Sequence, residues 1–212
     1  MRSILISIKP EWVEKIFTGK KILEIRKSIP KCNLPCKVYI YCTQSTKYAF
    51  YHIKDERFML YKGTGKQVNG NLSCGTKLNG KVVAEFTLHD IETIDRDYND
   101  WLPKRMYDIM PSQLEASCLT EEQLDNYGKG KTLYAWCIDD LKIYKQPKAL
   151  NEFKKDLDCD DYPCNKNSDC KYNYYDTSEG CWACGIDFDG ANCIYKQINK
   201  APQSWCYVEE IK

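Results

Sequence analysis

The sequence predicts an α+β protein: a small mixed β-barrel with a few flanking helices, extended by a Cys-rich irregular insertion. Several short strand-like runs are separated by few helical patterns, and both ends of the chain have strand patterns. Residues 151–193 differ in composition, with Asp, Asn, Tyr and Cys in place of aliphatic residues. Chains rich in short strands are typical of barrels and sandwiches. We therefore expect one domain made of residues 1–150 and 194–212, with residues 151–193 inserted into it.

The strongest strand patterns are continuous or alternating apolar runs. The first, ILISI at 4–8, precedes a helix that Pro10 opens and Gly19 ends, with an apolar stripe between them. Residues 61–80 are rich in Gly, Asn, Ser and Thr, which indicates a mobile loop. Two further helices are expected over 112–118 and, opened by a capping sequence at Thr120, up to 128. Further strands are expected over 22–27, 38–43, 81–94 (with a bend near 89–90), 133–144 and 204–211.

The composition is that of a globular protein, and its charge is unevenly distributed. The chain has 212 residues, 43% of them hydrophobic, and a net charge of +1. No apolar run approaches the roughly 20 residues of a membrane span, and no signal peptide is recognisable at the start, so we expect no membrane partner and a cytoplasmic location. Residues 1–47 contain ten basic and three acidic residues, whereas 151–193 contain four basic and ten acidic ones. A polyanion should therefore contact the N-terminal quarter.

A charged motif follows the first helix, in the stretch SIKPEWVEKIFTGKKILEIRK. Glu24 and Arg26 are two residues apart on a predicted strand, so their side chains share one face. Lys21 joins them only if it belongs to the turn after Gly19 rather than to the strand. Arg26 carries a planar fork that suits a phosphate or a base edge. The alternative is a surface ion pair of little energetic value.

This stretch resembles the ASCH family, a branch of the PUA-like superfamily. The family signature G-x-K-x-x-E-x-R is met by Gly19, Lys21, Glu24 and Arg26. The resemblance continues through VYIYCTQ (38–44), VVAEF (82–86), TLYAWCI (132–138) and APQSWCYV (201–208), but not through 151–193. It implies a PUA-like barrel with a polar groove that binds RNA or a nucleoside or nucleotide.

The resemblance also implies candidate site residues. In the ASCH enzymes that hydrolyse acetylcytidine, a lysine, a threonine and a glutamate act together; Lys21 and Glu85 match two of them, and Glu24 replaces the threonine. A carboxylate cannot serve as the hydroxyl nucleophile of an amidohydrolase in the same way, so Glu24 would act as a general base toward water, with Lys21 and Arg26 stabilising an oxyanion.

The family's groove lies near Ser7 and Lys9, for which the alternative is a capping serine and a solvated lysine. Trp205 is a candidate for stacking on a base, or else a residue that closes the barrel.

The Cys-rich segment suggests a metal site. Six of the 13 cysteines lie within 159–193, and the C-x-x-C pair is followed by glycine. We expect zinc held by Cys164, Cys170, Cys181 and Cys184, with Cys193 as a replacement. The alternative is a segment of reduced, free thiols. His52 and His89 have no convincing partners in the sequence and are expected to be non-catalytic.

Three functions remain open from the sequence. The first is RNA or nucleotide binding in the groove around the motif. The second is hydrolysis of a modified nucleoside or of RNA by Lys21, Glu24 and Glu85. The third is a protein-interaction role of residues 151–193, although the sequence points to no particular protein partner.

Overall fold

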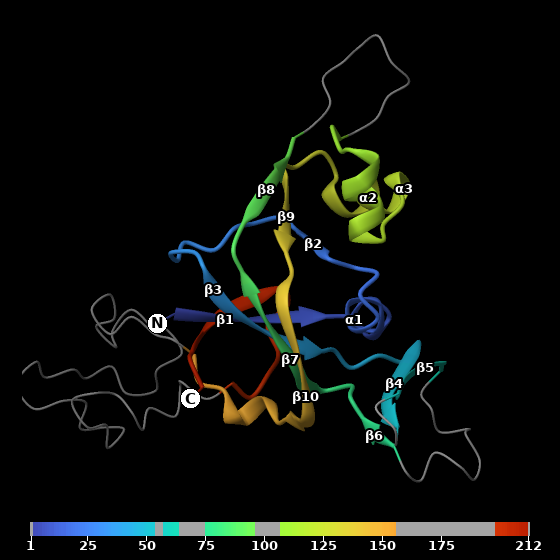
Figure 1. Ribbon diagram of the computed structural model, residues 1–212, viewed down its shortest axis with the longest axis vertical. Coiled ribbons are helices and arrows are strands. Elements are labelled where there is room, and N and C mark those ends of the chain that lie inside the picture. The colour runs from blue at the N-terminus through green and yellow to red at the C-terminus, as the bar shows by residue number, and fades with distance from the viewer. Residues whose placement is uncertain (1, 54–56, 64–74, 96–106, 156–197, 212) are drawn as a thin grey trace, which may run out of the picture.

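The computed structural model describes residues 2–53, 57–63, 75–95, 107–155 and 198–211 (Figure 1). Its main element is a five-stranded sheet with the order β10-β7-β3-β1-β11. β1 and β3 run parallel at its centre, and the other pairs are antiparallel. The strands are β1 (Arg2–Ile8), β3 (Cys36–Cys42), β7 (Lys81–Leu88), β10 (Asp139–Lys148) and β11 (Trp205–Glu209).

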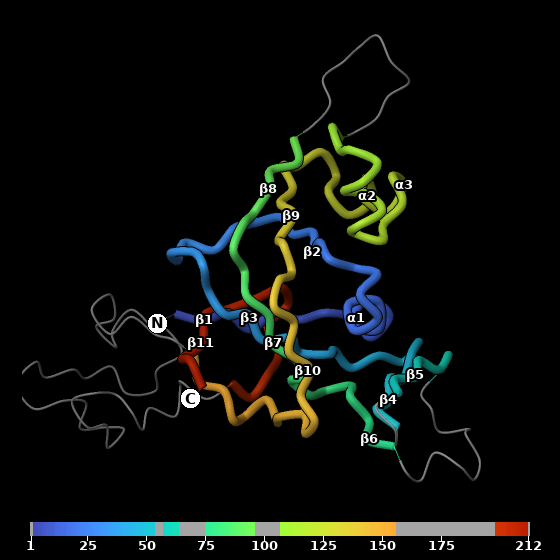
Figure 2. Tube along the Cα trace, in the orientation of Figure 1, coloured from blue at the N-terminus to red at the C-terminus, as the bar shows by residue number. Residues whose placement is uncertain are grey.

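A bent two-stranded antiparallel ribbon connects this sheet to a second one, as the trace in Figure 2 shows. The second sheet has the order β2-β9-β8, formed by β2 (Leu23–Arg26), β9 (Leu133–Cys137) and β8 (Ile91–Ile94). β7 leads directly into β8, and β9 leads into β10. The break between β7 and β8 falls at His89 and Asp90, where the sequence predicts a bend. The opposite strand turns at Asp140, whose φ is 48°.

A third, small sheet stands beside the first helix. It has the order β5-β4-β6, with β4 (Tyr48–Ile53), β5 (Arg57–Lys62) and β6 (Thr76–Lys77). The loop expected over residues 61–80 is therefore wrong at residues 61–62 and 76–77, which pair as strands, while residues 64–74 lie outside the described residues. The Gly/Asn/Ser-rich composition gave no sign of them, because most of β5 precedes residue 61 and β6 has only two residues.

The three helices are placed by the signals that the sequence carries. α1 (Pro10–Phe17) begins with proline in its first turn and buries Val13 and Ile16. α2 (Pro111–Ser117) and α3 (Glu121–Gly128) follow β8. At the start of α3 the hydroxyl of Thr120 accepts from the backbone N–H of Gln123, as its capping sequence predicts. A short 3₁₀ turn, η1 (Leu150–Glu152), follows β10.

The ladders of the described strands do not close into a ring, so the predicted barrel is not confirmed; the fold is a sheet-rich mixture of strands and helices. Hydrogen bonds connect residues 204–207, at the start of β11, with residues 26–31, at the end of β2 and just after it. The bridges are Arg26 Nη1 to Ser204 Oγ at 3.2 Å, Trp205 Nε1 to Ser28 Oγ at 3.1 Å, and Lys31 N to Tyr207 Oη at 2.5 Å.

The Cys-rich segment enters and leaves the fold at one place. Phe153 is fully buried, and its carbonyl accepts from the N–H of Ile198 at 3.3 Å. Residues 156–197, including Cys164, Cys170, Cys181 and Cys184, lie outside the described residues, so zinc binding stays a prediction. Within the described part of the chain, no group of three or more His, Cys, Asp or Glu residues could hold a metal ion. No described helix is long and apolar enough to span a membrane.

Candidate functional site

A cavity of about 1050 Å³ lies where the parallel strands β1 and β3 end. The carboxyl ends of parallel strands are a frequent location of ligand sites, because side chains and loops from several elements converge there. Here α1, β2 and α3 form further walls, together with the segment that leads into β11. The polar and aromatic lining includes Ser7, Lys9, Glu11, Trp12, Lys21, Glu24, Arg26, Tyr41, Thr43, Gln44, Gln123, Asn126, Tyr127, Asn199, Lys200, Gln203 and Ser204.

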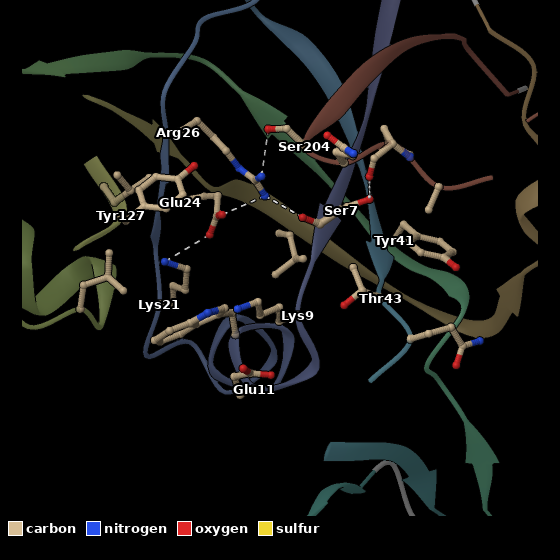
Figure 3. A pocket seen from close by; sticks show the side chains of 18 of the residues that line it. Ser7, Lys9, Glu11, Lys21, Glu24, Arg26, Tyr41, Thr43, Tyr127 and Ser204 are labelled. Atoms are coloured by element: carbon tan, nitrogen blue, oxygen red, sulfur yellow. Dashed lines mark hydrogen bonds and ion pairs between the residues drawn. The ribbon is translucent and has the colours of Figure 1, made fainter. Parts of the chain in front are cut away.

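A buried triad of charges forms one side of this cavity (Figure 3). The Glu24 carboxylate lies between two cations, with Oε2 3.2 Å from Lys21 Nζ and Oε1 3.0 Å from Arg26 Nη2. Lys21 is 2% exposed, Arg26 7% and Glu24 8%. The triad therefore carries one excess positive charge in a site almost shielded from solvent. The surface ion pair considered from the sequence does not describe it.

The G-x-K spacing builds this triad through the end of α1. Gly19 has φ 71°, a left-handed conformation that favours glycine. The N–H groups of Lys20 and Lys21 both donate to the carbonyl of Lys15, at 2.9 and 3.0 Å, and so close the helix end. β2 begins only at Leu23, so Lys21 lies in the turn, which is the condition for its joining Glu24. Gly19 shapes the turn and does not line the cavity.

Lys21 has an acceptor for each of its three ammonium protons. Besides Glu24, Nζ donates to the carbonyls of Leu23 and Ser117, both at 2.8 Å. It also lies 5.4 Å from the centre of the Trp12 ring. An ammonium with all its donors engaged can fix charge and geometry in the site, but it has no further proton to donate to a ligand without breaking a bond.

Arg26 connects three segments that are distant in the sequence. Its Nη2 donates to the backbone carbonyl of Ser7 at 2.8 Å and pairs with Glu24, while Nη1 donates to the hydroxyl of Ser204. Its Nε is buried and has no hydrogen-bond partner among the described residues. The guanidinium therefore holds β1, β2 and the approach to β11 around the cavity.

Ser7 and Lys9, the candidates taken from the family resemblance, both line the cavity. The hydroxyl of Ser7 donates to the carbonyl of Pro202 at 2.7 Å, so that side chain already has a structural partner. Lys9 is exposed at the start of α1. These positions leave Lys9 the freer of the two to meet a ligand.

Helix α3 contributes a wall that the sequence analysis did not identify. Gln123, Asn126 and Tyr127 lie three and four residues apart, so they share one helix face, which points at the cavity. This polar stripe at helical spacing was the available signal. Burial raises the pKa of the Tyr127 hydroxyl, and the nearby Arg26 charge opposes that rise. Lys27 Nζ lies 4.7 Å from the centre of the Tyr127 ring.

Glu85 is not brought to the triad. Its carboxylate accepts from the Tyr144 hydroxyl at 2.5 Å and lies 3.7 Å from Lys142 Nζ, and it does not line the cavity. Glu85 pairs with Tyr39 across β3 and with Lys142 across β10. The arrangement of Lys21, Glu24 and Glu85 expected for hydrolysis is therefore not assembled in this structure.

Trp205 also lies outside the cavity lining. Its ring packs against Trp136 at 5.8 Å and against Tyr207 at 5.4 Å between ring centres. Together with its hydrogen bond to Ser28, these contacts place the ring against other side chains of the protein rather than in the cavity.

Comparison with known proteins gives structural matches alone. No protein-family model matches this sequence, and no curated protein matches it. The solved structures similar to it include the ASCH protein of Zymomonas mobilis, with 21% identity, 71% of this chain and 75% of that chain covered, and a TM-score of 0.43. Two variants of that bacterial protein match at 19% and 20% identity, each covering 71% of this chain and 77% and 75% of their own, with TM-scores of 0.42. All three bear the name of the family that the motif around Lys21 resembles.

Proposed function

We propose that the cavity binds a nucleotide, either free or as one unit of an RNA chain. The observation that carries this proposal is the buried triad of Lys21, Glu24 and Arg26, whose excess positive charge faces a large cavity with aromatic and amide walls. An anionic group entering the cavity would compensate that charge, and Lys9 and Lys200 on the lining add to the attraction.

The rest of the lining suits a base and a sugar. A volume of about 1050 Å³ accommodates a ligand of nucleotide size, since small-molecule sites commonly span some 300–1,000 Å³. The side-chain amides of Gln123 and Asn126 offer donors and acceptors for the edge of a base. The Tyr127 ring, 37% exposed at the rim, offers an apolar face for stacking.

Hydrolysis has less support. Both oxygens of Glu24 are paired with cations, Lys21 has no spare donor, and Glu85 is bound to Tyr144 instead. The protein-interaction alternative depends on residues 151–193, most of which lie outside the described residues.

The test is calorimetric titration with nucleoside monophosphates and with the matching unphosphorylated nucleosides. We expect the monophosphates to bind more tightly, and Asn126→Ala together with Tyr127→Leu to weaken binding by roughly tenfold or more. Glu122→Ala is the matched control, since Glu122 is exposed on the same helix and is not part of the lining. Equal affinity of the wild type and the double variant, or no binding of any monophosphate, would contradict the proposal.

A further inference from the structure

The small sheet of β4, β5 and β6 has two different faces. α1 covers one of them: Phe17 contacts Phe50 at 5.7 Å and Phe58 at 4.9 Å between ring centres. His52 stacks on Phe58 at 4.8 Å on that same covered face. Phe17, Phe50 and Phe58 therefore anchor the sheet to the body of the protein.

The opposite face carries Tyr51, Met59, Tyr61 and Lys77, together with Ile53, Arg57 and the buried Ala49. The register shows this, because directly paired residues of antiparallel strands share a face. Tyr51 pairs with Met59 and with Lys77, and Tyr61 pairs with Ala49, one step along the same face. Met59 is 41% exposed, and both tyrosines are partly exposed.

The two tyrosine rings do not stack on each other. Their centres are 5.8 Å apart with planes inclined at 78°, and the Tyr61 hydroxyl contacts the Met59 sulfur at 3.2 Å. This edge contact fixes the rings without covering a face of one ring with the face of the other. An aromatic face held in this way on a sheet is a surface on which a nucleic acid base can stack.

The charges that the structure describes in the three strands are of one sign. The described residues of the three strands include Arg57 and Lys77 on this face, Lys62 on the face that α1 covers, and no aspartate or glutamate. Lys47 lies just before β4, with its Nζ 5.3 Å from the Tyr48 ring centre. Over the whole sequence stretch 47–81, seven basic residues stand against two acidic ones. A polyanion complements such a surface.

The sheet is also connected directly to the cavity. Thr43 and Gln44 line the cavity at the end of β3, and β4 starts at Tyr48. In Figure 1 the sheet stands next to α1, and Glu11 and Trp12 of α1 line the cavity.

We propose that the face formed by Tyr51, Met59, Tyr61 and Lys77 binds single-stranded RNA, of which a nucleotide several positions further along the chain occupies the cavity. The inference rests on the proposed function for the cavity occupant, while the face itself is a separate surface. Bases stack on the tyrosine rings, and Lys77 with the basic residues around it neutralises phosphates. The protein would then prefer an oligonucleotide to a mononucleotide.

The test measures the binding of a labelled oligouridylate of about 12 nucleotides, by fluorescence anisotropy over a series of salt concentrations. Tyr51→Leu and Tyr61→Leu keep apolar bulk but remove the aromatic face, and each should weaken oligonucleotide binding by roughly tenfold. Lys77→Glu should reduce the steepness of the salt dependence by about 0.7 for each phosphate that the protein no longer neutralises. Lys145→Glu, an exposed charge reversal on β10, is the matched control and should change neither quantity as much.

Uridine monophosphate binding, measured on the same variants, separates the two proposals. Unchanged monophosphate affinity with weakened oligonucleotide affinity supports the face as a distinct RNA surface. Oligonucleotide affinity that is the same in Tyr51→Leu, Tyr61→Leu and wild type, with native circular dichroism, overturns it. If the oligonucleotide binds through this face but no monophosphate binds, the cavity proposal fails and the face remains.

Discussion

Replacement of Glu24 by glutamine tests the triad most directly. Glutamine has nearly the same shape as glutamate but no charge, so it leaves Lys21 and Arg26 in a buried site without the carboxylate that now lies 3.2 and 3.0 Å from them. The amide oxygen can accept from one of the two cations, but the amide NH₂ then faces the other. Both of those groups are hydrogen-bond donors, so no bond forms between them. Glu24→Gln should therefore destabilise the protein strongly while changing little of its volume.

The magnitude follows from the distances and the burial. At an effective dielectric constant of about 20, a contact of 3.0 Å between unit charges is worth roughly 5 kcal/mol before solvation is considered. Part of this is offset, because the variant no longer has to desolvate a carboxylate. Removing one partner of a buried ion pair typically costs about 3–5 kcal/mol, which is a large part of the roughly 5–15 kcal/mol that stabilises a domain.

Equilibrium unfolding in urea, followed by circular dichroism, measures this cost. Lys37 and Glu210 supply a matched control, since their charged atoms lie 2.8 Å apart but the side chains are 32% and 37% exposed. Glu210→Gln should cost less than about 1 kcal/mol because solvent screens the pair. Added phosphate should recover more stability in Glu24→Gln than in the wild type, because the cluster's excess positive charge is larger in the variant. A loss in Glu24→Gln no larger than in Glu210→Gln would refute the reasoning from burial.

Three further perturbations have defined outcomes. Trp205→Phe should lower the melting temperature, because the hydrogen bond to Ser28 is removed, yet leave mononucleotide affinity unchanged in calorimetry; weakened affinity would restore a stacking role. Burial and the hydrogen bond to Glu85 raise the pKa of Tyr144, so its stabilising contribution is full below the ordinary value of 10.0 and is lost as the pH rises above it. Tyr144→Phe should flatten the alkaline fall of unfolding free energy and cost about 1 kcal/mol at neutral pH; an unchanged alkaline profile would contradict this. Burial raises the pKa of the Cys42 thiol to about 12, so in native protein at about pH 8 it should resist alkylation, as mass spectrometry would show, and react once the chain unfolds.

The local part of the site could be predicted from the sequence. Proline at the start of α1, a glycine at its end and alternation along β2 are rules of a few residues, and they place α1, the turn after it and the shared face of Glu24 and Arg26. The position of Lys21 depended on where β2 begins, and the condition stated from the sequence is the one that the structure meets. The capping sequence at Thr120 fixed the start of α3 in the same way.

The contacts between distant segments of the chain could not be predicted from the sequence. Arg26 and Ser204 are separated by 178 residues, and no periodicity connects them. Glu85 lies between apolar residues in the run VVAEFTL. In a half-buried strand the alternation of apolar and polar residues assigns each side chain to a face, but in this run it does not decide to which face the Glu85 side chain belongs. In addition, the register between β3 and β7 shifts after Ile40, so the spacing of residues in the sequence does not give their positions on the sheet. The prediction that joined Glu85 to the triad depended on the family resemblance, and nothing local corrected it.

Stability alone does not explain why three charges are buried beside this cavity. The free energy of desolvating an ion pair offsets much of its Coulomb attraction. A protein with apolar residues of the same volume in such positions is often at least as stable. Here the triad has two cations and one anion, so one positive charge remains uncompensated, and the buried Nε of Arg26 remains without a partner among the described residues. An anion in the cavity would compensate the charge and stabilise the folded state by mass action. The unfolding temperature should then rise with phosphate or nucleotide concentration, and Glu24→Gln, with its larger excess charge, should respond more steeply than the wild type.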